Sequence, residues 1–145
     1  KLLEVAEFLN KAEFVDIHCM PAEDFDLGSL ENKPDVILTS PPYYNLENYT
    51  DHPDQSYNRH SNFEDWKNNW YLPLIGDCLD NINPEGLSAW NVMDINQCNL
   101  VEPMIDLHQQ CGWELVDTLG FHSPLNYIRK LKNKDVTYLF VKTGK

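Results

Sequence analysis

The residues best suited to chemistry are Thr39 to Tyr43, with the sequence Thr-Ser-Pro-Pro-Tyr, directly after the apolar run Val36 to Leu38. The apolar run predicts a short buried strand. Each proline fixes φ at about −65° and has no N–H, and Pro42 also keeps Pro41 out of the helical region. The backbone should therefore leave the strand in a stiff, extended form, in which one of its carbonyls can face a ligand.

This arrangement could orient an exocyclic amine of a nucleobase for alkylation. Such an amine is a poor nucleophile, because its lone pair is delocalised into the ring. The Ser40 hydroxyl and a main-chain carbonyl at Ser40 or Pro41 could accept its hydrogens, which would localise the lone pair and favour the developing positive charge. The Tyr43 ring could stack on an extruded base, a contact worth about 1–3 kcal/mol. The alternative is a strand exit that two prolines stiffen and that binds nothing.

The sequence Ser-Pro-Pro-Tyr at positions 40 to 43 resembles the catalytic motif of the amino-group DNA methyltransferases. The family form is Asp, Asn or Ser, then Pro-Pro, then Tyr or Phe, and these enzymes methylate cytosine N4 or adenine N6 with S-adenosylmethionine. The resemblance implies that Ser40, Pro41, Pro42 and Tyr43 are catalytic, and the serine favours the cytosine type. Related tetrads, usually with Asn first, occur in enzymes that methylate guanine in RNA or glutamine in proteins.

An acidic loop follows the predicted strand Phe14 to Met20. Doubly wound folds place ligand contacts just past the carboxyl ends of their strands. The resemblance implies that Glu23 or Asp24 accepts a hydrogen bond from the adenine amino group of the cofactor, that Phe25 flanks this ring and that Thr39 also contacts the cofactor. A solvated acidic loop is the alternative.

Composition limits the partners. The formal net charge is −12, from 11 Lys and Arg against 23 Asp and Glu. Such a surface does not hold a phosphate backbone unaided, so binding double-stranded DNA with a flipped base would need a segment outside this chain. The basic cluster Arg129 to Lys134 could contact phosphate, or could be a solvated loop. Four cysteines without C-x-x-C spacing, scattered histidines and the lack of a membrane-length apolar run predict a cytoplasmic protein without a metal site.

The elements that must position these residues alternate along the 145 residues, which predicts a single α/β domain. Helices are expected over Leu2–Ala12, from Asn62 through Leu79, and over Val101–Cys111. Strands are expected over Phe14–Met20, Val36–Leu38, Leu87–Met93, Trp113–Phe121 and Val136–Lys142. Trp66 and Trp70 should face the core. The long polar stretch Tyr44 to Ser61 is a candidate lid or base-contacting loop, with a disordered connector as the alternative.

The resemblance implies a Rossmann-like methyltransferase fold with a mostly parallel sheet and a C-terminal antiparallel hairpin. The family's Phe-x-Gly-x-Gly cofactor turn has no counterpart, because no two of the six glycines are spaced as G-x-G. The expected explanation is a catalytic domain incomplete at its N-terminus, which leaves a gap of about 10 Å in the sheet. This chain alone should then bind S-adenosylmethionine weakly and be inactive. Two alternatives are a catalytically silent methyltransferase-like module and a non-enzymatic domain that binds a nucleotide or a protein.

Overall fold

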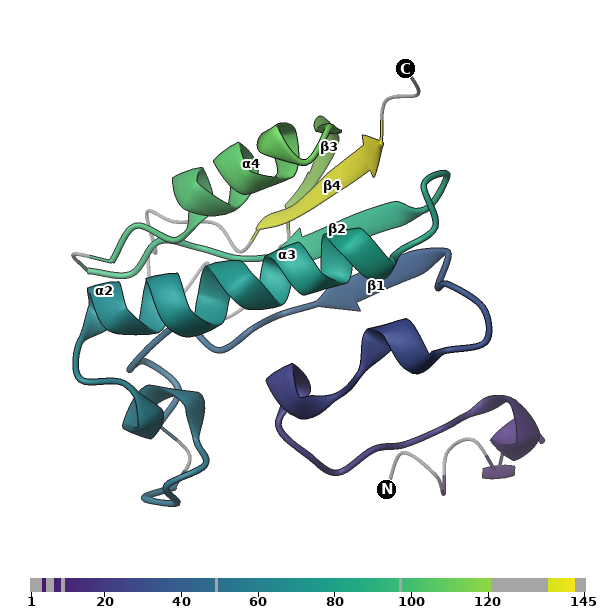
Figure 1. Ribbon diagram of the computed structural model, residues 1–145, viewed down its shortest axis with the longest axis horizontal. Coiled ribbons are helices and arrows are strands. Elements are labelled where there is room, and N and C mark those ends of the chain that lie inside the picture. The colour runs from purple at the N-terminus through teal and green to yellow at the C-terminus, as the bar shows by residue number, and fades with distance from the viewer. Residues whose placement is uncertain are drawn as a thin grey trace.

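The computed structural model describes residues 4, 7–8, 10–48, 50–96, 98–120 and 136–142 of the chain. These residues form a sheet with helices packed on one face (Figure 1). Of the predicted helix Leu2–Ala12 the structure describes residues 4, 7–8 and 10–12, of which Glu4, Glu7 and Phe8 are helical and residues 10–12 are not α-helical. The basic cluster Arg129 to Lys134 lies wholly outside them.

Four strands form the described sheet in the spatial order β1-β2-β4-β3. They are β1 Val36–Thr39, β2 Leu87–Asn91, β3 Trp113–Gly120 and β4 Val136–Lys142. β1 and β2 run parallel, whereas β4 pairs antiparallel with both β2 and β3. The α/β class and the C-terminal antiparallel hairpin are confirmed. The expectation of a mostly parallel sheet is wrong for the described strands, because β4 lies between β2 and β3 and adds two antiparallel pairings.

Helices α3 and α4 cover one face of this sheet (Figure 1). The described α-helices are α2 Phe63–Trp66, α3 Leu72–Asn81 and α4 Val101–Gln110. A π-helical turn, Lys67–Tyr71, joins α2 to α3 into one helical run, and α3 contacts α4. None of the described helices has the length and apolar character that crossing a bilayer requires.

The ends and the irregular turn of this helical run follow from its sequence. Asn62 Oδ1 accepts a hydrogen bond from the Asp65 N–H at 3.0 Å and caps the start of α2, so the predicted helix start near Asn62 is confirmed. Pro73 has no N–H to continue a regular helical ladder. The π-helical turn just before it accommodates this defect, with the Leu72 N–H bonded back to the Lys67 carbonyl.

Large aromatic side chains form the core. Trp66 and Tyr71 are fully buried with 5.2 Å between their ring centroids, and Trp70 lies 4.9 Å from Trp66. The prediction that Trp66 and Trp70 face the core is therefore confirmed. The sheet contributes Trp90 and Phe140, which are also fully buried.

The predicted strand Phe14–Met20 is wrong. Phe14 ends a short 3-10 turn, and residues 15–19 have no regular secondary structure and pair with no strand in the described part of the chain. Val15 and Ile17 stay 40% and 48% exposed. Alternating apolar and polar residues produce a strand only where a neighbouring edge completes the hydrogen-bond ladder. β1 is itself an edge strand of the described sheet, with Leu38 75% exposed, so re-pairing does not close the expected gap beside it.

Candidate functional site

The Ser-Pro-Pro-Tyr bend begins at the carboxyl end of β1, beside the carboxyl end of the parallel strand β2. Thr39, the last residue of β1, pairs with β2 one residue before Asn91. Ser40 therefore follows the strand beside Asn91, and 3.4 Å separates Ser40 Oγ from Asn91 Oδ1. Ser40 is exposed, Pro41 is buried and Pro42 is half-buried. The bend thus presents Ser40 at the edge where α/β folds bind ligands.

A cavity of about 280 Å³ opens beside this bend. Its walls come from the acidic loop after Met20, from the bend, from the polar loop after Tyr44 and from the helical run. Six of its lining residues are Glu23, Ser40, Pro42, Glu47, Asp54 and Trp70. One predicted cofactor contact, Glu23, and two predicted catalytic residues, Ser40 and Pro42, therefore share one cavity although they lie far apart in the sequence.

Tyr43 does not line this cavity. Its side chain is only 6% exposed and belongs to the aromatic core. Its hydroxyl donates to Asn91 Oδ1 at 2.9 Å and to the Asn91 carbonyl at 3.1 Å. The ring offers no open face to a base in this conformation, so stacking on a base stays a prediction that requires the ring to move.

The other predicted cofactor contacts lie apart from the cavity at the bend. Asp24 is exposed, Thr39 is half-buried in β1, and neither lines this cavity or its neighbour. Phe25 lines that neighbouring, largely apolar cavity of about 330 Å³, with its ring 4.5 Å from the ring of His18. Cys78 lines it too, and burial raises the pKa of its thiol to about 11, which keeps the thiol protonated and unreactive at neutral pH.

The cavity at the bend is acidic. Every charged residue that lines it is a carboxylate, namely Glu23, Glu47 and Asp54. Glu23 is ion-paired with Arg59, and Asp54 Oδ2 lies 3.5 Å from His52 Nδ1. Such a lining favours hydrogen-bond donors and cationic groups and repels phosphate. The cavity therefore suits the amine of a base better than the phosphate backbone of a nucleic acid.

The described residues of the polar loop 44–61, which are all but residue 49, are folded on themselves rather than forming a plain connector. Gln55 Nε2 donates to Asn48 Oδ1 at 3.1 Å, and Asn58 Nδ2 donates to the His52 carbonyl at 2.9 Å. The ring of Tyr44 anchors the start of the loop in the aromatic core through several edge and tilted contacts. These contacts favour a wall or lid for the cavity over a disordered connector.

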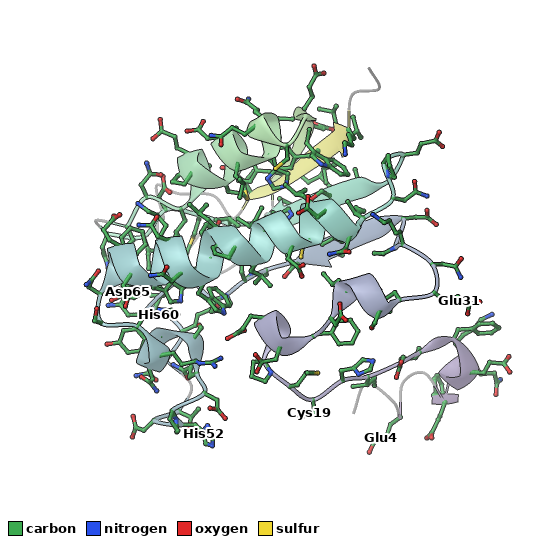
Figure 2. All side chains as sticks on the ribbon, in the orientation of Figure 1. Glu4, Cys19, Glu31, His52, His60 and Asp65 are labelled. Carbon is green, nitrogen blue, oxygen red and sulfur yellow. The ribbon has the colours of Figure 1, made fainter. Side chains whose placement is uncertain are left out.

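The histidines of this region do not form a metal site with the cavity. His60 lies against Asp65 at the start of α2, with 3.7 Å between His60 Nδ1 and Asp65 Oδ1 (Figure 2). The Ser61 N–H, which donates to this carboxylate, is the main reason that the pKa of Asp65 falls to about 2. In the part of the chain that the structure describes, no three His, Cys, Asp or Glu side chains are arranged to hold a metal ion.

Two residues at this site did not stand out in the sequence. Arg59 follows a long polar stretch without periodicity, so nothing indicated that it would reach Glu23. Asn91 ends the strand that runs parallel to β1, and strand pairing was the one signal that could have placed it beside Ser40.

Comparison with protein-family models found no match for this chain, and comparison with curated proteins found none.

Proposed function

We propose that the protein transfers a methyl group from S-adenosylmethionine to an exocyclic amine of a DNA base, with cytosine N4 favoured over adenine N6. The observation that carries this proposal is the cavity that Ser40 and Pro42 share with Glu23. From the sequence, the bend was expected to hold the amine of the base and the acidic loop to hold the cofactor. Residues of both segments line the same cavity.

The bend would orient the amine of a flipped base. The Ser40 hydroxyl lines the cavity and can accept one amine hydrogen. Within the described part of the chain no hydrogen bond reaches the carbonyl of Ser40 or Pro41, so a main-chain acceptor remains for the second hydrogen. Two acceptors hold the nitrogen lone pair out of conjugation and stabilise the positive charge of the transition state.

The cavity would hold only part of the cofactor. Its volume of about 280 Å³ is at the lower limit of ordinary ligand sites. Glu23 and Glu47 would hold hydrogen-bond donors of the cofactor, which when bound supplies an electrophilic methyl group. Glu23 would first have to exchange Arg59 for such a donor.

The isolated 145-residue chain should bind S-adenosylmethionine weakly. It has no G-x-G turn for the amino-acid end of the cofactor, and Glu23, the predicted cofactor contact that shares the cavity with the bend, is already ion-paired with Arg59. We expect calorimetric titration of the chain to show no binding at micromolar concentrations. A micromolar dissociation constant would show that the described cavities suffice to hold the cofactor.

The proposed function is tested by methyl transfer to DNA in the intact protein that carries this chain. We expect Ser40→Ala to lower the transfer rate about tenfold, which corresponds to the loss of one hydrogen bond. Ser29→Ala is the matched control, because Ser29 is exposed and lines neither of the two cavities. Labelled cofactor gives the rate, and analysis of the methylated base distinguishes cytosine N4 from adenine N6. Unchanged transfer by Ser40→Ala would contradict the role of Ser40, and no transfer by the wild type would contradict the function.

A second candidate is a methyltransferase-like module that binds its ligand without catalysis. The specific observation that favours it is the packing of Tyr43, whose ring is buried and whose hydroxyl is bonded to Asn91. Methyl transfer by the intact protein separates the two candidates, because a silent module transfers no methyl group either as the wild type or as Tyr43→Phe. Tyr43→Phe removes the hydroxyl and keeps the ring, so an enzyme whose ring must leave the core to stack on a base should still transfer the methyl group.

A further inference from the structure

Asn91 connects the Ser-Pro-Pro-Tyr bend to the sheet. It is the last residue of β2, and its side-chain oxygen accepts from the Tyr43 hydroxyl at 2.9 Å and from the Ser40 hydroxyl at 3.4 Å. Its side-chain nitrogen donates to Thr137 Oγ1 of β4 at 3.2 Å. One amide group therefore contacts two residues of the bend and one residue of the neighbouring strand.

The hydrogen bonds fix which way this amide points. An amide oxygen can only accept and an amide nitrogen can only donate. With Nδ2 engaged by Thr137, Oδ1 is directed at the two hydroxyls of the bend. Thr137 is only 8% exposed, so water competes little for this contact.

The consequence for Ser40 concerns its single proton. A serine hydroxyl has one O–H and two lone pairs. When the proton points at Asn91 Oδ1, both lone pairs remain for the cavity that Ser40 lines. The hydroxyl then accepts from a ligand that presents N–H groups, such as the amine of cytosine, and has no proton to offer to a carbonyl oxygen.

The two contacts to Asn91 Oδ1 differ in strength. The Tyr43 contact at 2.9 Å has an ordinary hydrogen-bond length, whereas 3.4 Å is long for a hydroxyl donor. The Tyr43 bond therefore anchors the bend, and the Ser40 bond sets the direction of a proton. Hydrogen bonds of this second kind are commonly long without substrate and shorten in the complex.

We propose that Asn91 is a positioning residue that holds the Ser40 hydroxyl as a hydrogen-bond acceptor toward the cavity. This role rests on the proposed function, because it matters for catalysis only if an amine binds there. It makes the site selective for an amino group over a carbonyl group at the same ring position, which separates cytosine from uracil or thymine.

The test uses methyl transfer to DNA by the intact protein. Asn91→Leu removes the amide at similar volume, and Asn91→Asp keeps oxygen acceptors in its place. We expect Asn91→Leu to lower kcat about tenfold with KM for DNA nearly unchanged, and Asn91→Asp to restore most of kcat. The matched control is Asn83→Leu. Asn83 Nδ2 donates to Asp35 Oδ1 at 3.0 Å just before the amino ends of β2 and β1, away from the bend. Losing this hydrogen bond should leave kcat unchanged.

Equal losses in Asn91→Leu and Asn91→Asp would overturn the positioning role and leave the proposed function intact. So would an equally large loss in Asn83→Leu. If the wild type transfers no methyl group, the proposed function fails. Amide hydrogen exchange in the chain then tests whether Asn91 anchors the bend. The Leu46 N–H, bonded to the Tyr43 carbonyl at 3.1 Å, should exchange several-fold faster in Asn91→Leu than in the wild type or Asn91→Asp. Equal exchange rates in the three proteins would overturn the role of Asn91 altogether.

Discussion

Replacing Trp66 by alanine should lower the free energy of unfolding by about 3–5 kcal/mol, the usual cost of removing a buried tryptophan. Trp66 is fully buried at the end of α2, with Trp70, Tyr71 and Tyr44 at ring-centroid distances of 4.9, 5.2 and 5.6 Å. Truncation would leave a large cavity among rigid rings that cannot collapse to fill it. Urea denaturation followed by far-ultraviolet circular dichroism measures the loss.

Trp66→Phe is the matched control. Within the described residues Trp66 Nε1 is buried without a hydrogen-bond partner, so phenylalanine keeps a ring and removes an unsatisfied donor. We expect it to cost less than about 1.5 kcal/mol, since the two changes partly offset. A loss below about 1.5 kcal/mol for Trp66→Ala would contradict the central place of this ring in the core.

The Trp66 substitution should also reach the site. Tyr44 connects the ring of Trp66 to the polar loop 44–61, and this loop supplies Glu47 and Asp54 to the cavity at the bend. Loosening the aromatic cluster therefore loosens one wall of the cavity. Proteolysis of the loop should become faster in Trp66→Ala than in Trp66→Phe.

Local chemistry made much of the fold predictable. The helix start at Asn62 depends on a side-chain cap. The end of α4 at Gln110 is followed by Gly112, whose φ of +82° glycine adopts without strain. The strand Val36–Leu38 and the hairpin strand Val136–Lys142 depend on apolar runs, and both are present, β1 with one residue more at its carboxyl end. Each of these features is decided within a few residues of sequence.

Features that depend on distant residues could not be predicted. Residues 15–19 alternate like a strand, but a strand also needs an edge to pair with, and the sequence does not show where edges lie. Tyr43 is an aromatic residue after two prolines, and whether its ring faces the cavity or the core depends on Asn91, forty-eight positions away. The pairing of β1 with β2 brings Asn91 within reach of the bend. The sequence predicted an α/β sheet but not which residues of these two strands lie side by side.

Acidification should destabilise the protein through one buried histidine. His108 is fully buried in α4, where its Nδ1 bonds the Met104 carbonyl at 2.8 Å and its Nε2 lies 3.1 Å from Ser88 Oγ. The Met104 bond requires a proton on Nδ1, so the neutral ring accepts from the Ser88 hydroxyl through Nε2. The indole N–H of Trp90 donates to the same Ser88 Oγ at 2.7 Å. Every polar atom of this buried chain thus has a partner only while the histidine is neutral.

Burial lowers the pKa of His108 from 6.5 to about 4, against a smaller opposing effect of the Met104 carbonyl. The unfolded chain therefore binds the proton at higher pH than the folded protein. Stability from the neutral ring is fully present above pH 6.5 and is lost as the pH falls toward 4. The shift corresponds to a loss of about 3 kcal/mol across this window.

The measurement is the free energy of unfolding by urea at several pH values from 7 down to 4. His108→Gln can keep an acceptor toward Ser88 and a donor toward Met104 without titrating, so its stability should fall much less across the same window than that of the wild type. His52→Gln, at an exposed site, should keep the wild-type slope.

Asp65 does not contribute to the pH dependence in this range, because its pKa is lowered to about 2 and its contribution to stability is lost only below its ordinary value of 3.8. Equal slopes for the wild type and His108→Gln would show that this histidine does not control the acid response. A smaller slope for His108→Gln would show that the loss of stability in acid begins at the contact between His108 and Ser88. Ser88 belongs to β2, the strand that also contains Asn91.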